Sequence, residues 1–188
     1  MKNVTKLLLC LAVCWATIHG MATVAVSLTI SPDALAKTQH PIPADPAARN
    51  YLGLSGSGSF RLPQVKADLL IVEVFSMYCP YCQADAPKVN ELYNLIAKHP
   101  RSRGRIKILG IGIGNTPYEV DVFRRKFGVP FPLVPDEQLA IQRWADKPFR
   151  TPTFIVLKRG QGSVHQIMKV HVGQLENVRQ FFDLISGM

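Results

Sequence analysis

The sequence E-V-F-S-M-Y-C-P-Y-C-Q-A-D-A-P, residues 73–87, contains two cysteines three positions apart, Cys79 and Cys82. The apolar run Leu69–Phe75 leads into it and predicts a buried strand. After the cysteines, apolar residues recur at helical spacing and predict a helix over Pro80–Lys98. A Cys-X-X-Cys between a strand and a helix is typical of thiol–disulfide exchange. Because the amide groups and dipole of a helix start stabilise a thiolate, we expect Cys79 to be the nucleophile and Cys82 to close a redox-active disulfide with it.

The chain has 188 residues, enough for one domain with a proper core, and four cysteines. Two of the cysteines lie in an apolar leader, and the other two form the close pair. One close pair is typical of redox chemistry, whereas a structural framework uses several pairs. A zinc site needs about four ligands, and His165 and His171 lie on a predicted strand far along the chain. We therefore expect neither a metal nor a cofactor.

The formal net charge is +9, with basic residues gathered in segments 101–107 and 124–126. Such charge either attracts acidic partners, phosphate or a membrane surface, or belongs to solvated loop and helix faces. No nucleic-acid-binding motif accompanies it. We favour solvated faces and expect no nucleic-acid partner.

Residues 1–36 resemble an export leader. Lys2 and Lys6 precede the apolar residues 7–18, and the leader ends in Ala34-Leu35-Ala36, an A-x-A-like cleavage site. The mostly apolar residues 7–30 are also long enough to span a bilayer, so the leader is either a signal peptide or an N-terminal membrane anchor. Both alternatives place the domain in the periplasm or another extracytoplasmic, oxidising compartment.

Residues 37–59 are rich in Pro and then in Gly and Ser, which predicts a linker with little order before about Phe60. The folded domain is expected over residues 60–188. Further strands are predicted at 106–113, 153–158 and 164–172, with a short edge strand within 129–135 and a turn at 160–162. Helices are predicted at 117–127, capped by Thr116, and at 138–145 and 174–185. This alternation predicts an α/β sandwich around a mixed sheet.

The strand, the Cys79-Pro80-Tyr81-Cys82 motif, the helix and a distant Thr151-Pro152-Thr153 together resemble the thioredoxin fold over residues 60–188. Within that superfamily the chain is most similar to the TlpA/ResA-type extracytoplasmic thiol–disulfide oxidoreductases. C-P-Y-C-Q-A-D-A-P is similar to their C-x-x-C-x-x-E-x-P, and residues 106–136 match their extra strand–helix insertion. The resemblance implies a thioredoxin-like three-layer sandwich with a central mixed β-sheet. Asp85 replaces the usual Glu, and Tyr78 stands where Trp is common.

The resemblance assigns catalytic roles to two acids. An acid at the spacing of Glu73 lies beneath the cysteines in thioredoxins and helps to deprotonate the second thiol, and a raised pKa in a buried site suits this role. The alternative is a strand-edge Glu73 that points to solvent. Asp85 occupies the position of the family's active-site Glu, or is an ordinary first-turn acid that complements the helix dipole.

The resemblance also implies that Pro152 follows a cis peptide bond and, with Thr151, offers backbone to an extended substrate, although few X-Pro bonds are cis in general. Thr151 would tune the redox potential of the cysteine pair, and Pro80 and Tyr81 would tune the thiolate. Four aromatic residues form either an apolar rim for substrate or part of the core: Tyr78, Trp144, Phe149 and Phe154.

These features favour a thiol–disulfide oxidoreductase that acts as a reductase on exported proteins, with a membrane redox partner of DsbD/CcdA or DsbB type. The first alternative within the same chemistry is a disulfide oxidase or isomerase of DsbA/DsbG type. A thiol peroxidase is a second alternative, although Val72 stands where peroxiredoxins have Pro. A non-catalytic binding module with a static disulfide is a third.

Overall fold

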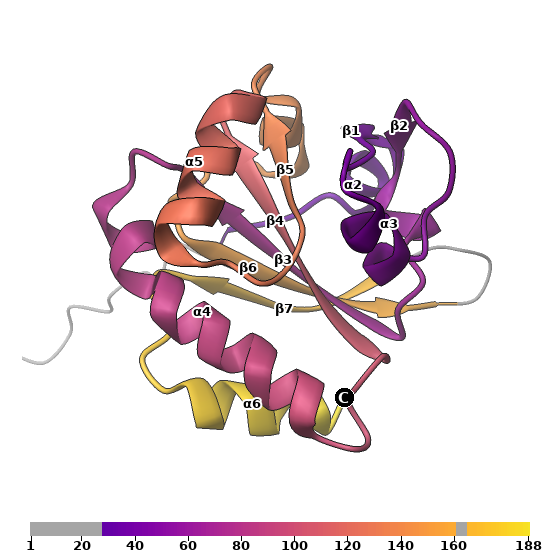
Figure 1. Ribbon diagram of the computed structural model, residues 1–188, viewed down its shortest axis with the longest axis vertical. Helices are drawn as coiled ribbons and strands as arrows, with labels where there is room; N and C mark the ends of the chain where they lie inside the picture. Colours follow the sequence, from indigo (N-terminus) through magenta and orange to yellow (C-terminus); the bar gives the residue numbers. More distant parts are fainter. Residues whose placement is uncertain (1–27, 161–164) are drawn as a thin grey trace, which may run out of the picture.

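The computed structural model describes residues 28–160 and 165–188. Its centre is a mixed five-stranded sheet of order β5-β4-β3-β6-β7 (Figure 1). The central strand β3 (Leu69–Phe75) runs parallel to β4 (Ile106–Ile113) and antiparallel to β6 (Thr153–Arg159). At the edges, β5 (Leu133–Asp136) is parallel to β4, and β7 (His165–Val172) is antiparallel to β6. The predicted α/β sandwich with a mixed sheet is therefore confirmed.

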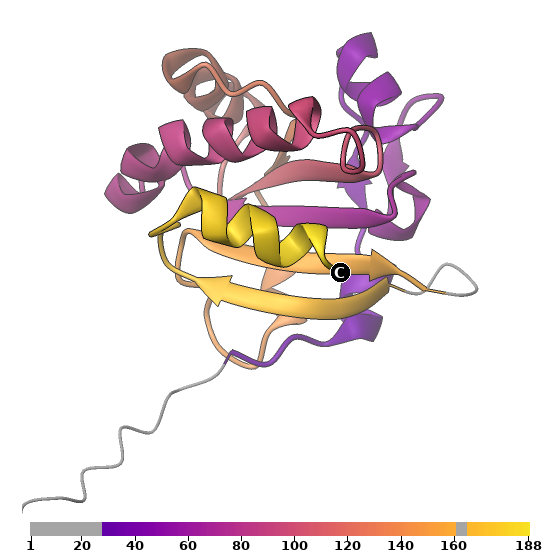
Figure 2. The ribbon, with the colours of Figure 1, turned by 90° about the horizontal axis from the view of Figure 1, so that it is seen from below.

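Helices α4 (Pro80–Lys98), α5 (Pro117–Phe127) and α6 (Val178–Ser186) contribute to the core on one face of the sheet. Figure 2 shows α4 and α6 side by side. The predicted bounds of α4 and α5 are confirmed, and Thr116 caps α5 as expected. The last helix begins at Val178, later than predicted, because Asn177 caps it by accepting the Gln180 N–H at 2.9 Å.

Alternate residues of β3 point to opposite faces of the sheet, as in any strand. Ile71 and Phe75 pack in the core beneath α4, α5 and α6, whereas Val72 and Val74 pack in the core of the opposite face. All seven residues of β3 are buried. Position 73 therefore faces the helix that carries the cysteines.

The second face of the sheet is covered by the N-terminal segment, so the expectation of little order before Phe60 is wrong. This segment forms helices α2 (Pro32–Lys37) and α3 (Pro46–Leu52) and a small sheet of β1 (His40–Pro41) and β2 (Ser59–Phe60). A 3-10 turn, η1 (Leu62–Gln64), follows. A second 3-10 element at Ala140–Trp144, η2, stands where an α-helix was predicted and packs in the same core.

The local sequence explains why α3 forms. Asp45 accepts the Ala47 N–H at 2.9 Å as N-cap, and Pro46 occupies the first helical position, where its missing N–H costs nothing. Gly53 ends the helix in the left-handed conformation with φ +70°. Leu52 is fully buried, and the Tyr51 hydroxyl accepts the Ile108 N–H at 2.9 Å. The segment is therefore a packed layer of the domain.

Residues 1–27 of the predicted leader and residues 161–162 of the predicted turn lie outside the described residues. The predicted cleavage triplet lies within α2, where Leu35 is 1% exposed in the core. Among the described residues, no helix is long and apolar enough to cross a membrane.

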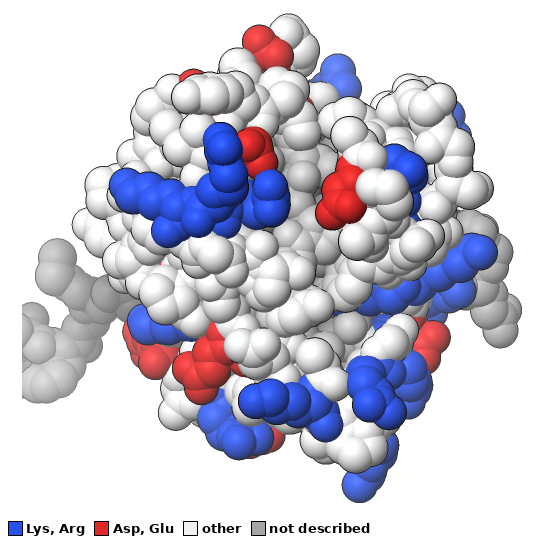
Figure 3. Space-filling model, in the orientation of Figure 1, with Lys and Arg blue, Asp and Glu red and all other residues white. Residues whose placement is uncertain are grey.

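Helix α5 lies close against β4. A Cβ at Gly112 would stand 2.8 Å from a methyl carbon of Val120, so only glycine allows this approach. On its exposed side, Figure 3 shows basic side chains gathered over α5 with an acidic side chain among them. Asp121 pairs there with Arg124 at 2.7 Å and with Arg125 at 3.0 Å, so part of this charge is balanced within the helix.

Candidate active site

The two cysteines lie at the start of α4. Cys79 is the N-cap, and its Sγ accepts the Cys82 backbone N–H at 3.3 Å. Both are free thiols in the structure, Cys79 partly exposed and Cys82 fully buried. The Cys79 thiol also donates to the Thr151 carbonyl oxygen at 3.2 Å. The pair is therefore asymmetric, with one accessible sulfur and one covered sulfur.

The surroundings separate the acidities of the two thiols. Partial burial raises the pKa of Cys79, but hydrogen bonding from the Thr151 side chain and from the thiol and backbone of Cys82 outweighs it, and the net pKa is lowered. Burial is the largest cause that raises the pKa of Cys82 far above its usual range. Near neutral pH, Cys79 is therefore the better source of thiolate.

The Thr151–Pro152 peptide bond is cis, which confirms the expectation from the resemblance. The Pro152 carbonyl accepts the Gly173 N–H at 2.8 Å, which ties this loop to the end of β7. The loop therefore lies at the same end of the sheet as Cys79. Pro80 and Tyr81, the two residues between the cysteines, are exposed.

Glu73 is 2% exposed, so the alternative of a solvent-facing carboxylate is wrong. Its strand position faces α4, which carries Cys82 and Asp85. Burial first, and then the nearby Asp85 carboxylate, raise the pKa of Glu73 to about 8. An acid with such a pKa holds its proton at neutral pH and can exchange it there.

Asp85 is fully buried on α4, beyond the first turn of the helix, so it is not an ordinary first-turn acid. Both carboxylate oxygens accept the Leu175 N–H, at 3.1 and 3.2 Å, and Lys88 Nζ lies 3.6 Å away. Burial raises its pKa, while the Leu175 N–H and Lys88 oppose the shift. Asp85 therefore links α4 to the segment that precedes α6 and adds negative charge near Glu73.

Of the two alternatives for the four aromatic residues, the core is right for three and an exposed position for one. Trp144 and Phe154 are fully buried, and Phe149 is partly buried against the core beside Trp144. Of the four, Tyr78 is exposed, at 64%. The Trp144 indole N–H donates to Thr38 Oγ1 at 2.8 Å, so Trp144 anchors the N-terminal layer.

Sequence reasoning missed the residues that hold the loop before Cys79. The Oδ1 of Asn115, a fully buried residue, accepts the Met77 N–H at 2.8 Å, and the Gln83 side chain donates to the Met77 carbonyl at 2.7 Å. The Tyr78 hydroxyl donates to a carboxylate oxygen of Glu119 in α5. The only sequence signal here, Asn115-Thr116-Pro117, marks a helix start and does not reveal contacts with a loop 38 positions earlier.

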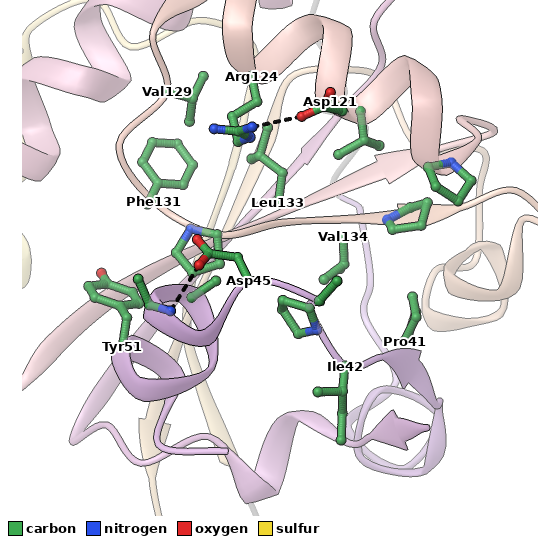
Figure 4. Close-up of a pocket in the computed structure, with 18 of the residues that line it drawn as sticks. Pro41, Ile42, Asp45, Tyr51, Asp121, Arg124, Val129, Phe131, Leu133 and Val134 are labelled. Atoms are coloured by element: carbon green, nitrogen blue, oxygen red, sulfur yellow. Dashed lines mark hydrogen bonds and ion pairs between the residues drawn. The ribbon is translucent and has the colours of Figure 1, made fainter. Parts of the chain in front are cut away.

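A separate cavity of about 720 Å³ lies between α3 and the α5–β5 segment (Figure 4). Arg124, Asp121, Phe131 and Leu133 line it on one side and Tyr51 on the other. None of the predicted site residues lines this cavity. Over residues 28–160 and 165–188, no group of three or more His, Cys, Asp or Glu side chains is placed to hold a metal ion.

A Cys-X-X-Cys at the start of a helix, beside a cis-proline loop on a mixed sheet, defines a thioredoxin-fold protein. The comparison with protein families agrees. Residues 46–184 match the Redoxin family, and the chain belongs to that family.

The chain is 26% identical over 129 residues to the thiol-disulfide oxidoreductase ResA of Geobacillus thermodenitrificans, which covers 67% of this chain and 68% of the relative. Two solved structures show the same fold. StoA from Bacillus subtilis has a TM-score of 0.53 at 17% identity and covers 69% of this chain and 90% of its own. A secreted Mycobacterium tuberculosis disulfide oxidoreductase homologous to E. coli DsbE has a TM-score of 0.55 at 13% identity, covering 70% and 90%. The chain is accordingly a thiol–disulfide oxidoreductase.

Proposed function

We propose that this protein reduces disulfides in polypeptides outside the cytoplasm, with Cys79 as the nucleophile and Cys82 as the resolving thiol. The observation that carries the proposal is the asymmetry of the pair: Cys79 is partly exposed and has a lowered pKa, whereas Cys82 is buried and has a raised pKa. The first sulfur can reach a client, and the second can reach only Cys79.

The exchange proceeds in two displacements. The Cys79 thiolate attacks one sulfur of the client disulfide, forms a mixed disulfide and releases the first client thiolate. Cys82, once deprotonated, attacks the Cys79 sulfur and releases the second. Two electrons and two protons have then passed to the client, and the enzyme holds a Cys79–Cys82 disulfide. A dithiol protein of DsbD/CcdA type is the donor that we propose for its re-reduction.

Glu73 is the group that we propose accepts the proton of Cys82, in the fraction of molecules in which its carboxylate is ionised. It faces α4 from the central strand, and with a pKa of about 8 it takes up and releases a proton near neutral pH. Asp85 acts on this step indirectly, because its charge helps to raise the pKa of Glu73. Thr151 and Pro152 are proposed to receive the client backbone next to Cys79, where the Thr151 carbonyl already contacts the sulfur.

The environment of Cys79 favours the reducing direction. Strong oxidants such as DsbA are oxidising because their reduced form is stabilised. Here only hydrogen bonds from neutral groups lower the pKa of Cys79, and burial opposes them. No cationic side chain of the described residues is among the groups that lower this pKa, which supports a reductase over an oxidase.

A redox titration of the full chain tests this direction. We expect a reduction potential for Cys79–Cys82 near the thioredoxin value of about −270 mV, and a value near the DsbA figure of about −120 mV would assign the protein to the oxidases instead. The Cys79→Ser/Cys82→Ser double variant keeps Cys10 and Cys14, so its titration measures the signal of these two cysteines alone.

Reduction of insulin with dithiothreitol as donor tests the roles of the two cysteines. Cys79→Ser should abolish the activity, and Cys82→Ser should accumulate a mixed disulfide with the client. If Cys79→Ser reduces insulin as fast as the wild type, the catalytic assignment fails.

The location outside the cytoplasm is proposed from the leader pattern, and the similarity to a secreted relative supports it. Because Ile30 and Leu35 pack in the core, we propose that any cleavage occurs before Ile30 and not after Ala36. Cell fractionation with sequencing of the mature N-terminus tests both points. A mature chain that begins at Lys37 would contradict the second.

A further inference from the structure

Six large apolar or aromatic side chains are exposed in the described part of the chain, and several gather near Cys79. Tyr78 and Tyr81 flank the nucleophile in sequence, and Val172 pairs with Thr153, directly after Pro152. Tyr118 precedes Glu119, the partner of the Tyr78 hydroxyl. The remaining two are Leu139 and Leu184. Exposed apolar surface gathered at one place marks an interaction site.

Tyr78 differs from the other exposed side chains because its tip is held. Its hydroxyl donates to Oε1 of Glu119, while Oε2 of the same carboxylate accepts the Thr116 N–H at 2.8 Å and the Thr116 hydroxyl at 3.0 Å. Glu119 thus belongs to the capping box of α5. The ring beside Cys79 is therefore attached to the first turn of a helix in the insertion.

The hydrogen bond leaves the ring itself open to solvent, with 64% of Tyr78 exposed. A fixed aromatic ring offers contact area without the entropy cost of ordering a loose side chain on binding. A client that is selected through this ring must contact both Cys79 and the ring. A polypeptide can cover both, because the residue next to its reacting cysteine lies within reach of the ring.

We propose that Tyr78 is a specificity-determining residue and that Glu119 is its positioning residue. Together they select polypeptide clients that carry an apolar side chain next to the reacting cysteine. This proposal rests on the proposed function and names the substrate class of the same site. The client cysteine is attacked by Cys79 while its apolar neighbour lies on the ring of Tyr78.

Two short peptides test the selectivity. They are identical except for the residue next to their single cysteine, which is Leu in one and Ser in the other, and each cysteine is joined in a disulfide to thionitrobenzoate. The reduced full-length enzyme attacks the peptide sulfur, the Cys79–peptide disulfide forms, and coloured thionitrobenzoate leaves as the thiolate. The ratio of the two second-order rate constants reports the selectivity. We expect the wild type to prefer the Leu peptide by about tenfold, since a tenfold preference corresponds to about 1.4 kcal/mol and full burial of a Leu side chain stabilises by roughly twice as much.

Two variants break the contact from opposite ends. Tyr78→Phe keeps the ring and the capping box but loses the hydroxyl, and Glu119→Ala loses the acceptor together with its capping-box bonds to Thr116. We expect each to lower the ratio to about threefold, and we expect the double variant to lower it no further, because both remove the same interaction. Tyr78→Ala should bring the ratio close to one. Asp121→Ala is the matched control, since it removes another exposed carboxylate of α5 and should keep the wild-type ratio and rates.

A spectroscopic measurement reads the contact without catalysis. The hydrogen bond to Glu119 is the largest cause of a raised pKa of Tyr78. Glu119→Ala should therefore lower the pKa of one phenol toward the ordinary tyrosine value. In Tyr78→Phe this titration should be absent, and in Asp121→Ala the raised pKa should remain.

The outcomes separate this proposal from the proposed function. A general structural defect would lower the rates with both peptides by one factor and keep the ratio, which would overturn the proposal. A wild-type ratio near one, or a Tyr78→Ala ratio equal to that of the wild type, would also overturn it while exchange itself continues. Absence of any exchange by the wild type would overturn the proposed function, and the specificity that rests on it would fall as well.

Discussion

Replacing Glu73 by Gln should make the protein more stable at neutral and alkaline pH. Glu73 is 2% exposed on the central strand, and its carboxylate is penalised by burial and by the nearby Asp85. Gln has nearly the same shape and never ionises. The substitution therefore removes the cost of a buried charge and leaves the packing of β3 nearly unchanged.

The size and the pH range of the effect follow from the pKa. Its rise from 4.5 to about 8 corresponds to about 5 kcal/mol at ~1.4 kcal/mol per pH unit. Between these two values the folded protein keeps a proton that the unfolded chain releases, so the free energy of unfolding falls as the pH rises. Below pH 4.5 Glu73 is protonated in both the folded and the unfolded state, and its contribution to the free energy of unfolding is at its most favourable. Above pH 8 both are ionised, and the full cost is present.

Urea unfolding of the reduced full-length protein at a series of pH values measures this term. The advantage of Glu73→Gln over the wild type should grow by about 3 kcal/mol between pH 4.5 and pH 7, and by about 5 kcal/mol above pH 8. Glu91→Gln, which changes an exposed residue of the same helix as the cysteines, should follow the wild type. If the curves of Glu73→Gln and wild type run parallel from pH 5 to pH 8, Glu73 is an ordinary ionised carboxylate, and its proposed proton transfer to and from Cys82 is refuted.

Three further changes test other parts of the structure. Asp85→Asn removes a charge that raises the pKa of Glu73 in the folded protein, so the pH-dependent loss of stability should end at lower pH and be smaller in the same unfolding series, and an unchanged profile would contradict the coupling. Leu52→Ala should lower the free energy of unfolding by about 2–5 kcal/mol, the usual cost of a cavity in a core, whereas a negligible change would show that the N-terminal layer does not fold with the sheet. Gly112→Ala places a Cβ 2.8 Å from a methyl carbon of Val120 and should cost about 1–3 kcal/mol in thermal or urea unfolding; wild-type stability would show that α5 can move away from β4.

The central part of the fold could be predicted from local pattern. The apolar runs of β3 and β4 are buried on both faces, so their composition alone indicates strands, and both have the predicted bounds. Thr116 and Gly128 mark the ends of α5 through local backbone chemistry. The cis bond before Pro152 was accessible only through the resemblance, because most X-Pro bonds are trans.

The N-terminal layer was missed because its prolines were interpreted as breaks. Pro46 stands between a capping Asp45 and a helix that ends at Gly53, which is a normal position for proline at a helix start. The same signals were accepted at Thr116-Pro117. The Pro, Gly and Ser content of residues 37–59 was therefore given more weight than the helix signals at Asp45, Pro46 and Gly53. The burial of Leu52 depends on packing against the sheet, which the local sequence does not reveal.

Contacts between distant segments account for the rest of what sequence reasoning missed. The insertion was identified as a feature of a family, but Asn115 and Glu119 make it part of the active site by holding Met77 and Tyr78. No periodicity encodes these bonds, which join residues 38 and 41 positions apart. They arise because β3 and β4 are parallel neighbours, so the loops that follow both strands meet at the same edge of the sheet. A change in the insertion can therefore alter client selection without touching either cysteine.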